Sequence, residues 1–243
     1  MNTKTVVITG ASSGIGFAIA NAYLNRGFNV VGNSRTQDRL DEAVNKFDNP
    51  QNFLGVAGDI SKADTAKALF AKAKTRFGKV DILINNAGIF IAKPVTAYTD
   101  EDLDQLINTN LKGFFYPTRE AVAHMSENKT GHIVNITASV AIQPNINVPA
   151  SLAILIKGGI DHATKALSLE LTSSNIKVSS VAPGIINTPM HPVENHQFLK
   201  SLHPGGEMGT TQDIVDAVMY LADAKFTTGI VLPVDGGSSS GKW

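Results

Sequence analysis

The residues with the clearest chemical meaning form a glycine-rich stretch, TGASSGIG at positions 9–16, between an apolar strand pattern and a helical one. Glycines at such a turn let the backbone bend tightly and approach a pyrophosphate, whose charge the helix N-terminus offsets. The spacing is Gly-xxx-Gly-x-Gly, which differs from the Gly-x-Gly-xx-Gly of the general dinucleotide fingerprint. By itself the stretch fits a phosphate-binding loop or a tight turn that binds no ligand. The candidate cofactor contacts are Gly10, Ser12, Ser13, Gly14, Ile15 and Gly16.

The end of the second expected strand bears on the choice between NAD and NADP. An acidic residue there binds the ribose 2′-hydroxyl of NAD, whereas an Arg accommodates the 2′-phosphate of NADP. This chain has Ser34 followed by Arg35, and the next carboxylate is Asp38. The pattern favours NADP over NAD. The alternative is that Arg35 is an ordinary solvated surface charge.

Short β-branched runs alternate along the chain with longer helical patterns, and these elements must position the candidate residues. Most of the runs are almost continuously apolar, as expected of parallel strands covered on both faces. The order predicts an α/β fold, a single Rossmann-type doubly wound parallel sheet of about seven strands with helices on both faces. The expected strands are Thr5–Thr9, Asn29–Gly32, Phe53–Val56, Ile82–Asn85, His132–Ile136, Val178–Ala182 and Ile230–Val234. The expected helices are Ile15–Arg26, Arg39–Phe47, Ala63–Phe77, Asp100–Ser126, Leu152–Ser173 and Thr211–Ala222.

The chain shows no linker, repeat or charge block, so residues 1–243 are predicted to form one dinucleotide-binding domain. Thr99 followed by Asp102 resembles a helix capping box, with Asp in place of the usual Glu. Pro189–Gly209 is the one long irregular segment, and such segments are often lids over a site. We therefore expect residues 189–209 to form a substrate lid.

The composition argues against several classes of function. Lys and Arg together number 21, as do Asp and Glu, which disfavours the basic footprint of a nucleic-acid-binding protein. The chain has no Cys, which excludes disulfides and thiolate chemistry. No apolar run approaches the ~18 residues of a membrane span and no secretory signal is visible, so a cytoplasmic protein is expected. His191, His196 and His203 lack the spacing of a zinc site, so no metal is predicted and these side chains are expected to be solvated.

Several separate motifs occur in an order that resembles the short-chain dehydrogenase/reductase family over essentially the whole chain. They are the glycine-rich turn, Asp59-Ile60, Asn85–Gly88, Asn110 in Asn-Leu-Lys-Gly, Pro183-Gly184 with Thr188, and Val234–Gly237. The cofactor contacts that this resemblance implies are Asp59 and Ile60 at the adenine, Asn86, Ala87 and Gly88 at the adenosine and ribose, Thr188 at the nicotinamide amide, and also Pro183, Gly184 and Ile186. Residues 86–88 fit a strand-end turn that stabilises the sheet as well, and the two roles are compatible.

The chemistry of the resembling family uses a Ser, a Tyr-xxx-Lys pair and an upstream Asn. The Tyr gives a proton to the carbonyl oxygen as hydride reaches the carbon, and the Lys, one helical turn later, lowers the Tyr pKa and holds the ribose. Lys157 fits the Lys position, and the residue four positions before it is Ala153. No Tyr lies between Tyr116 and Tyr220, so no shift of register restores the motif.

The other family positions are filled, each with an alternative explanation. Ser139 is the expected Ser and Thr137 the second choice, although Ser139 also fits a loop hydroxyl that caps a turn. Asn110 is expected to help hold a relay water, although Asn also interrupts helices by competing for backbone hydrogen bonds. Lys157 is expected to contact the ribose, and the alternative is a surface lysine.

Together these residues predict an NADP-dependent oxidoreductase with an atypical site, acting on a carbonyl or related group of a small-molecule substrate. Lys157, Ser139 or a water beside Ala153 would then supply the proton. The alternative is a cofactor-binding protein with little or no turnover, a sensor or an oligomer partner. Helices 111–126 and 152–173 are apolar beyond a single stripe and need a second buried surface, which predicts a homo-oligomer, a tetramer or a dimer.

Overall fold

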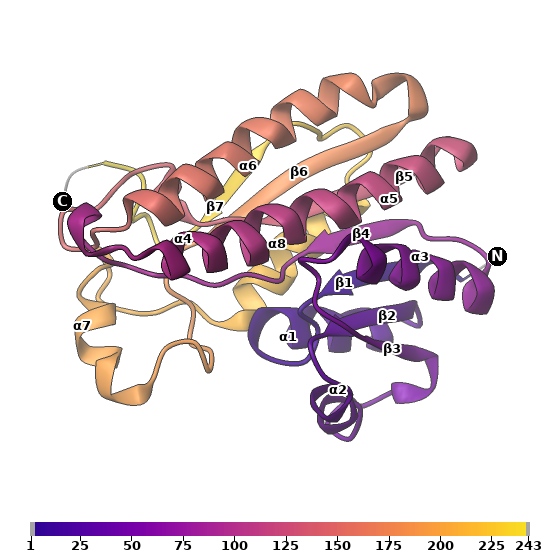
Figure 1. The fold of residues 1–243 in the computed structure, drawn as a ribbon, viewed down its shortest axis with the longest axis horizontal. Helices are drawn as coiled ribbons and strands as arrows, with labels where there is room; N and C mark the ends of the chain where they lie inside the picture. Colours follow the sequence, from indigo (N-terminus) through magenta and orange to yellow (C-terminus); the bar gives the residue numbers. More distant parts are fainter. Residues whose placement is uncertain (1–2, 242–243) are drawn as a thin grey trace.

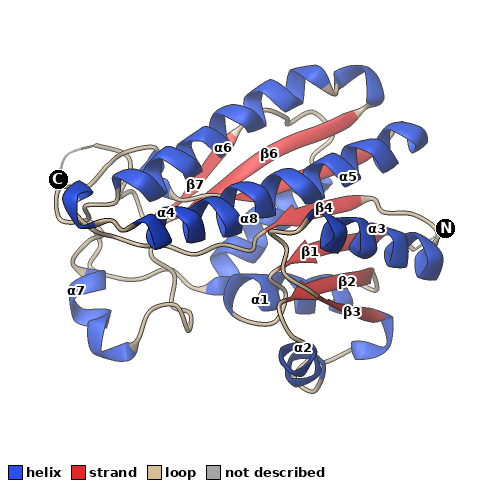
Figure 2. Cartoon of the chain, in the orientation of Figure 1, coloured by secondary structure: helices blue, strands red, loops and turns tan. Residues whose placement is uncertain are grey.

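The computed structural model describes residues 3–241, and its centre is a parallel sheet of seven strands (Figures 1 and 2). The strands are β1 (Thr5–Thr9), β2 (Asn29–Ser34), β3 (Phe53–Ala57), β4 (Ile82–Asn85), β5 (Gly131–Ile136), β6 (Ile176–Pro183) and β7 (Val231–Val234). Their order in the sheet is β3-β2-β1-β4-β5-β6-β7, and every neighbouring pair is parallel. The predicted fold class is confirmed.

Helices cover both faces of this sheet (Figure 2). The longer helices are α1 (Gly14–Asn25), α2 (Gln37–Val44), α3 (Ala63–Phe77), α5 (Gly113–Asn128), α6 (Ser151–Glu170) and α8 (Thr211–Asp223). Alternate residues of β1 define the two layers, because Val6 and Ile8 pack with α1 and α8 whereas Val7 packs with α3 and α5. Full burial of each such side chain stabilises the fold by roughly 1.5–3 kcal/mol.

The sheet has a point at which its winding reverses. The chain runs outward from β1 to β3, returns to the centre, and then runs outward the other way from β4 to β7. In an open parallel sheet, ligands bind at the carboxyl ends of the strands beside this reversal, which here lies between β1 and β4. The glycine-rich loop after β1 and residues 86–88 after β4 both lie at this edge.

The expected helix Asp100–Ser126 is interrupted in the structure. It consists of α4 (Asp100–Leu106), a π-helical turn from Ile107 to Lys112, and α5, which continues to Asn128. The capping box at its start is present, because Asp102 N donates to Thr99 Oγ1 at 3.3 Å and Thr99 N donates to Asp102 Oδ2 at 3.0 Å. A π-turn inside a helix often marks a functional site, and this one contains Asn110.

The segment Pro189–Gly209 is not wholly irregular. It contains a 3₁₀ turn, Val193–Asn195, and the short helix α7, His196–Lys200. Its far end returns to the sheet, because Gly209 forms a parallel bridge with Ile186. Within residues 3–241 there is no helix with both the length and the apolar character needed to cross a membrane.

Candidate active site

The glycine-rich loop joins β1 to α1 without capping the helix. Ser13 is the N-cap residue of α1, and its side chain makes no capping hydrogen bond. The first N–H groups of α1 therefore have no side-chain acceptor in this loop, which suits an anion such as a phosphate. Gly10 has φ of +68°, and a Cβ at Gly16 would collide with the Gly10 carbonyl oxygen and the Asn86 side chain. The packing thus requires a loop without side chains at these positions, and such a cradle fits a pyrophosphate.

Asn86 ties the segment after β4 to this loop. Its Nδ2 donates to the carbonyl oxygens of Thr9 at 2.9 Å and Gly10 at 3.1 Å. Thr9 Oγ1 accepts from the backbone N–H groups of Asn86 and Ala87, each at 3.0 Å. The Asn86 side chain therefore stabilises the two strand ends, while Ala87 and Gly88 remain beside the loop. Thr9 was not predicted as a site residue, although a lone polar residue directly before the glycine-rich turn was a visible signal.

The end of β2 carries a buried neutral hydroxyl, Ser34, followed by an exposed cation, Arg35. Ser34 is buried, and its Oγ lies 3.0 Å from Ser12 Oγ on the glycine-rich loop. Arg35 is exposed and forms no ion pair with any residue of the described range 3–241. Asn33 Nδ2 bridges to the carbonyl oxygens of Val56 and Gly58, each at 3.0 Å, so β2 and β3 end together.

The two residues expected at the adenine have different environments. Asp59 is exposed, and its Oδ1 accepts a hydrogen bond of 2.9 Å from Ser61 N. Ile60 is only 5% exposed and packs in the core layer of α3 and α5, where its Cγ2 would lie 3.1 Å from a Cβ added at Gly113. Ile60 thus has a structural role in the core, and the adenine contacts remain a prediction.

The segment after β6 brings the remaining predicted cofactor residues to the same edge. Pro183 ends β6 and pairs with Val234, and Gly184 follows it. Thr188 faces the glycine-rich loop, because its Cβ and Cγ2 would lie 3.5 Å from a Cβ added at Gly14. Residues 183–188 and the loop before α1 therefore enclose one space from two sides.

His203 anchors the end of the segment 189–209 beneath this region. The prediction of a solvated histidine is wrong here, because His203 is only 5% exposed. Its Nε2 accepts a hydrogen bond of 3.1 Å from Ile185 N, and burial lowers its pKa. The reason is tertiary, since the ring packs against Gly184 and Asp235, where a Cβ on Gly184 would collide. A hollow of about 270 Å³ lies between these segments, lined in part by Ile186 and His203.

Asn110 is held by the chain that follows β4. Ile89 N donates to Asn110 Oδ1 at 2.8 Å, and Asn110 Nδ2 donates to the Ile89 carbonyl oxygen at 2.9 Å. Both ends of the amide are therefore used to position Ile89, and Asn110 is only 2% exposed. The structure accounts for Asn110 by this pairing, and its expected role in holding a relay water stays a prediction.

Lys157 lies on the buried face of α6 and is only 8% exposed. Its Nζ donates a hydrogen bond of 2.9 Å to the carbonyl oxygen of Ile136, the last residue of β5. Burial penalises the ammonium form and lowers the pKa of Lys157 to about 8, while the negative charge of Asp161 opposes that fall. The alternative of a surface lysine is wrong.

Gly88 marks the point where three predicted residues meet. A Cβ added there would lie 3.2 Å from Asn110 Oδ1 and 3.3 Å from Lys157 Nζ. Gly88, in the segment after β4, therefore lies where the π-turn before α5 meets the buried face of α6, at the carboxyl edge of the sheet. This convergence places a buried amine at the carboxyl edge of the sheet, the edge at which open parallel sheets bind their ligands.

Ala153, one turn before Lys157, is completely buried. It belongs to an apolar cluster with Leu106, Ile156 and Ile160, against which the side chain of Tyr98 also packs. The Tyr98 hydroxyl donates to the Ile91 carbonyl oxygen at 2.9 Å. Position 153 itself therefore offers no proton donor.

Of the two candidate hydroxyls, Thr137 and Ser139, only that of Thr137, the residue directly after β5, is hydrogen-bonded to a strand of the sheet. Thr137 Oγ1 donates to the carbonyl oxygen of Val181 at 3.3 Å and is buried between β5 and β6. Ser139 begins a 3₁₀ turn, and its Oγ lies 3.5 Å from Ser238 Oγ in the C-terminal segment. Ser139 is 6% exposed, so its hydroxyl is available only to a group that enters the site.

The chain is similar to known proteins over most of its length. Residues 4–198 match the short chain dehydrogenase family. The chain is also 36% identical over 245 residues to BbsD, a subunit of the (2S)-(R)-hydroxy(phenyl)methylsuccinyl-CoA dehydrogenase of Thauera aromatica, covering 98% of both chains. This chain belongs to the short-chain dehydrogenase family. A second relative of this dehydrogenase, 3beta-hydroxysteroid dehydrogenase 1 of Eggerthella lenta, is 36% identical over 244 residues, 96% of this chain and 93% of the relative.

Solved structures agree with this assignment. ElxO with NADP bound matches this short-chain dehydrogenase with a TM-score of 0.93 and 30% identity, covering 98% of this chain and 100% of ElxO. The resemblance that the motifs indicated is therefore confirmed. The class of activity, oxidoreduction with a nicotinamide dinucleotide, is confirmed with it.

Proposed function

We propose that this short-chain dehydrogenase is an NADP(H)-dependent oxidoreductase that acts on a carbonyl or related group, with Ala153 where its family usually has Tyr. The observation that carries this proposal is the convergence of Gly88, Asn110 and Lys157, whose Nζ would lie 3.3 Å from a Cβ on Gly88. The dinucleotide supplies hydride when bound. The chain must then hold the cofactor, orient the substrate and deliver a proton.

Support for NADP comes from the end of β2. Ser34 leaves this position without the carboxylate that would repel a 2′-phosphate, and Arg35 follows it exposed. Arg39 on α2 is exposed as well, so two cations lie beyond the end of the strand. The NADP bound to ElxO supports the same choice. The uncapped start of α1 would hold the pyrophosphate.

Lys157 is the best-placed proton donor in the absence of a phenol. An effective general acid has a pKa near the working pH, and burial brings the pKa of Lys157 to about 8. Within residues 3–241, one of its N–H groups is engaged by a protein acceptor, the Ile136 carbonyl. The Lys157 ammonium would give a proton to the oxygen of the substrate, with the Ser139 hydroxyl available to hydrogen-bond that oxygen.

Residues 1–243 are proposed to form one domain in which residues 189–209 cover the substrate. Three apolar side chains of this lid are exposed, Met190 at 54%, Val193 at 78% and Phe198 at 56%. Exposed apolar side chains on a segment that covers the substrate favour an apolar substrate, because substrate binding would bury them. In Figure 1, α7 lies at the same end of the molecule as α4.

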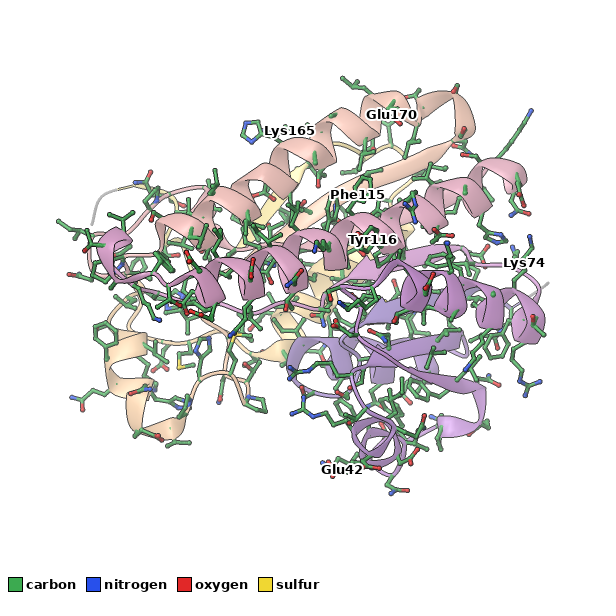
Figure 3. All side chains as sticks on the ribbon, viewed as in Figure 1. Glu42, Lys74, Phe115, Tyr116, Lys165 and Glu170 are labelled. Atoms are coloured by element: carbon green, nitrogen blue, oxygen red, sulfur yellow. The ribbon has the colours of Figure 1, made fainter. Side chains whose placement is uncertain are left out.

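A homo-oligomer and a cytoplasmic location are further parts of the proposal. On the outer surface of α5 and α6, Phe115 is 52% exposed and Leu155 is 70% exposed, and Figure 3 marks Phe115 beside Tyr116 on α5. Phe114 and Ile160 face the core, which leaves apolar residues on a second face of each helix. The absence of Cys suits a reducing compartment.

The test is to measure binding and turnover separately. Fluorescence titration of NADPH and NADH with the wild type and with Arg35→Ala should give tighter NADPH binding that Arg35→Ala weakens. NADPH oxidation with a panel of ketones, imines and activated alkenes should exceed background in the wild type and fall in Lys157→Met.

A second function is favoured by one observation, the apolar burial of Ala153. It is a cofactor-binding protein without useful turnover, a sensor or an oligomer partner. Tight NADPH binding with no oxidation of any substrate would support it and would contradict the enzyme. Equal affinities for the two cofactors would contradict the NADP preference.

A further inference from the structure

Asp161 is a buried carboxylate that none of the roles above explains. It lies one helical turn after Lys157 on the same face of α6 and is only 6% exposed. Its Oδ1 is fully buried and has no hydrogen-bond partner within residues 3–241. Because burying a carboxylate without full satisfaction is costly, such an atom calls for an explanation.

The charged groups that act on Asp161 are few. Burial raises the pKa of Asp161, and the charges of Lys157 and Lys165 oppose that rise. Lys165 is exposed on the outer side of α6 (Figure 3). From the sheet, the hydroxyls of Thr137 and Ser180 lower the pKa as well, against a larger rise from burial. Lys157, one turn earlier on the same buried face of α6, is therefore the buried cation that acts on Asp161, and the groups that act on it from Thr137 and Ser180 are neutral.

The hydroxyls around Asp161 belong to a larger buried network. Ser180 Oγ lies 2.8 Å from Thr164 Oγ1, and Asn135 Nδ2 donates to Thr164 Oγ1 at 2.8 Å. Asn135 Oδ1 in turn accepts from Asn85 Nδ2 at 2.9 Å. These contacts hold the surroundings of Asp161 in place from β4 to β6, so the carboxylate keeps a defined position behind the lysine.

Lys157 in turn lacks a direct anionic partner. No carboxylate of the described chain lies within ion-pair distance of its Nζ, and one turn earlier stands Ala153, which has no charge. An ammonium group donates three hydrogen bonds, of which Ile136 accepts one. Without a nearby anion, burial would drive this group toward its neutral amine.

We propose that Asp161 is a positioning residue of the active site, which keeps Lys157 in the charged form that can donate a proton. The inference rests on the proposed function. As hydride from the nicotinamide reaches the substrate carbon, an N–H bond of Lys157 breaks and an O–H bond forms on the substrate oxygen. The neutral amine then takes a proton from water, and Asp161 transfers no proton in this step.

The direct test follows Lys157 by NMR in the cofactor-free protein. The Lys157 Cε signal of ¹³C-lysine-labelled protein, assigned with Lys157→Met, is titrated in the wild type and in Asp161→Asn. Because an opposite charge at short range shifts a titration by about one to three pH units, Asp161→Asn should lower the Lys157 midpoint by about one unit or more. Asp161→Glu, which retains the negative charge, should bring the Lys157 midpoint most of the way back to its wild-type value. An unchanged midpoint in Asp161→Asn overturns the proposal.

Asp81→Asn is the matched control, because Asp81 is a similarly buried carboxylate before β4, at the opposite edge of the sheet. It should leave the Lys157 midpoint unchanged, and an equal shift in Asp81→Asn would overturn the specific role of Asp161. If Asp161→Asn fails to fold, the reciprocal measurement decides. The Asp161 Cγ titration must then move to higher pH in Lys157→Met, and no movement overturns the proposal.

The pH profile of turnover tests the positioning role of Asp161 separately from the proposed function. In the reductive direction, the alkaline fall of kcat/KM should move to lower pH in Asp161→Asn by the same amount as the NMR midpoint. Turnover with an unmoved profile overturns the role of Asp161 and leaves the proposed function standing. No turnover in the wild type overturns the proposed function and the donor role, even where the NMR midpoint shifts.

Discussion

Restoring a phenol at position 153 tests whether the missing proton donor limits this short-chain dehydrogenase. Ala153→Tyr places a hydroxyl one helical turn before Lys157, at the spacing of its family. Ala153→Phe is the matched control, because it adds the same ring without the hydroxyl. The ratio of the ketone reduction rates of the two variants therefore reports on the hydroxyl and not on the added volume.

The structure sets the size of both effects. Ala153 is completely buried beside Leu106 and Ile156, so either ring overpacks this cluster and should lower the free energy of unfolding by roughly 1–3 kcal/mol. A positioned general acid typically contributes about 10²–10⁴ in rate. Because Lys157 already supplies part of this, we expect Ala153→Tyr to reduce ketones about tenfold to a hundredfold faster than Ala153→Phe, which is ~1.4–2.7 kcal/mol of barrier.

The assay is single-turnover oxidation of saturating NADPH, so that weaker cofactor binding does not enter the rate. Urea unfolding of each variant establishes that the measured molecules are folded. Equal rates for Ala153→Tyr and Ala153→Phe would refute the missing-acid reasoning. So would a wild type that reduces simple ketones rapidly and is slowed by both rings.

Three further predictions concern the cofactor loop, acid stability and assembly. Gly16→Ala should weaken NADPH binding at least about tenfold and destabilise the fold by roughly 1–3 kcal/mol, because its methyl group would collide with neighbouring atoms. Gly159→Ala, with open space around it, should retain normal NADPH binding in the same titration and normal stability in the same unfolding assay. Equal behaviour of the two variants would contradict the packing argument. Burial lowers the pKa of His132 from 6.5 to about 4, so stability is complete above pH 6.5 and falls as the pH drops toward 4 because the unfolded chain binds the extra proton. Urea unfolding should show that the free energy of unfolding falls by about 2 kcal/mol less on acidification in His132→Gln than in the wild type, after allowance for the partial exposure of His132. An identical pH dependence in the variant would exclude His132 as the cause. Sedimentation at micromolar concentration should give an oligomer that the double variant Phe115→Glu and Leu155→Glu dissociates, and a monomeric wild type would contradict this prediction.

Much of the fold could be predicted from local pattern because each strand is an apolar run that only a doubly covered sheet can bury. The π-turn of residues 107–112 was missed, since its register depends on the pairing of Asn110 with Ile89, which lies 21 positions away. The burial of His203 was missed for a similar reason. A polar residue among prolines and glycines carries no periodic signal, and its hydrogen bond to Ile185 exists only in the folded chain.

The cofactor-binding loop could be inferred from the amino-acid sequence, because this loop depends on backbone shape and glycines at fixed spacing determine that shape locally. The charge states of Lys157 and Asp161 could not be inferred in this way. Lys157 and Asp161 are one helical turn apart in any helix, but their titration depends on desolvation by every neighbour and on the Ile136 carbonyl and the hydroxyls of β5 and β6. Those neighbours come from strands distant in the sequence, so only the packed structure determines whether this lysine is a surface charge or a buried acid with a pKa of about 8.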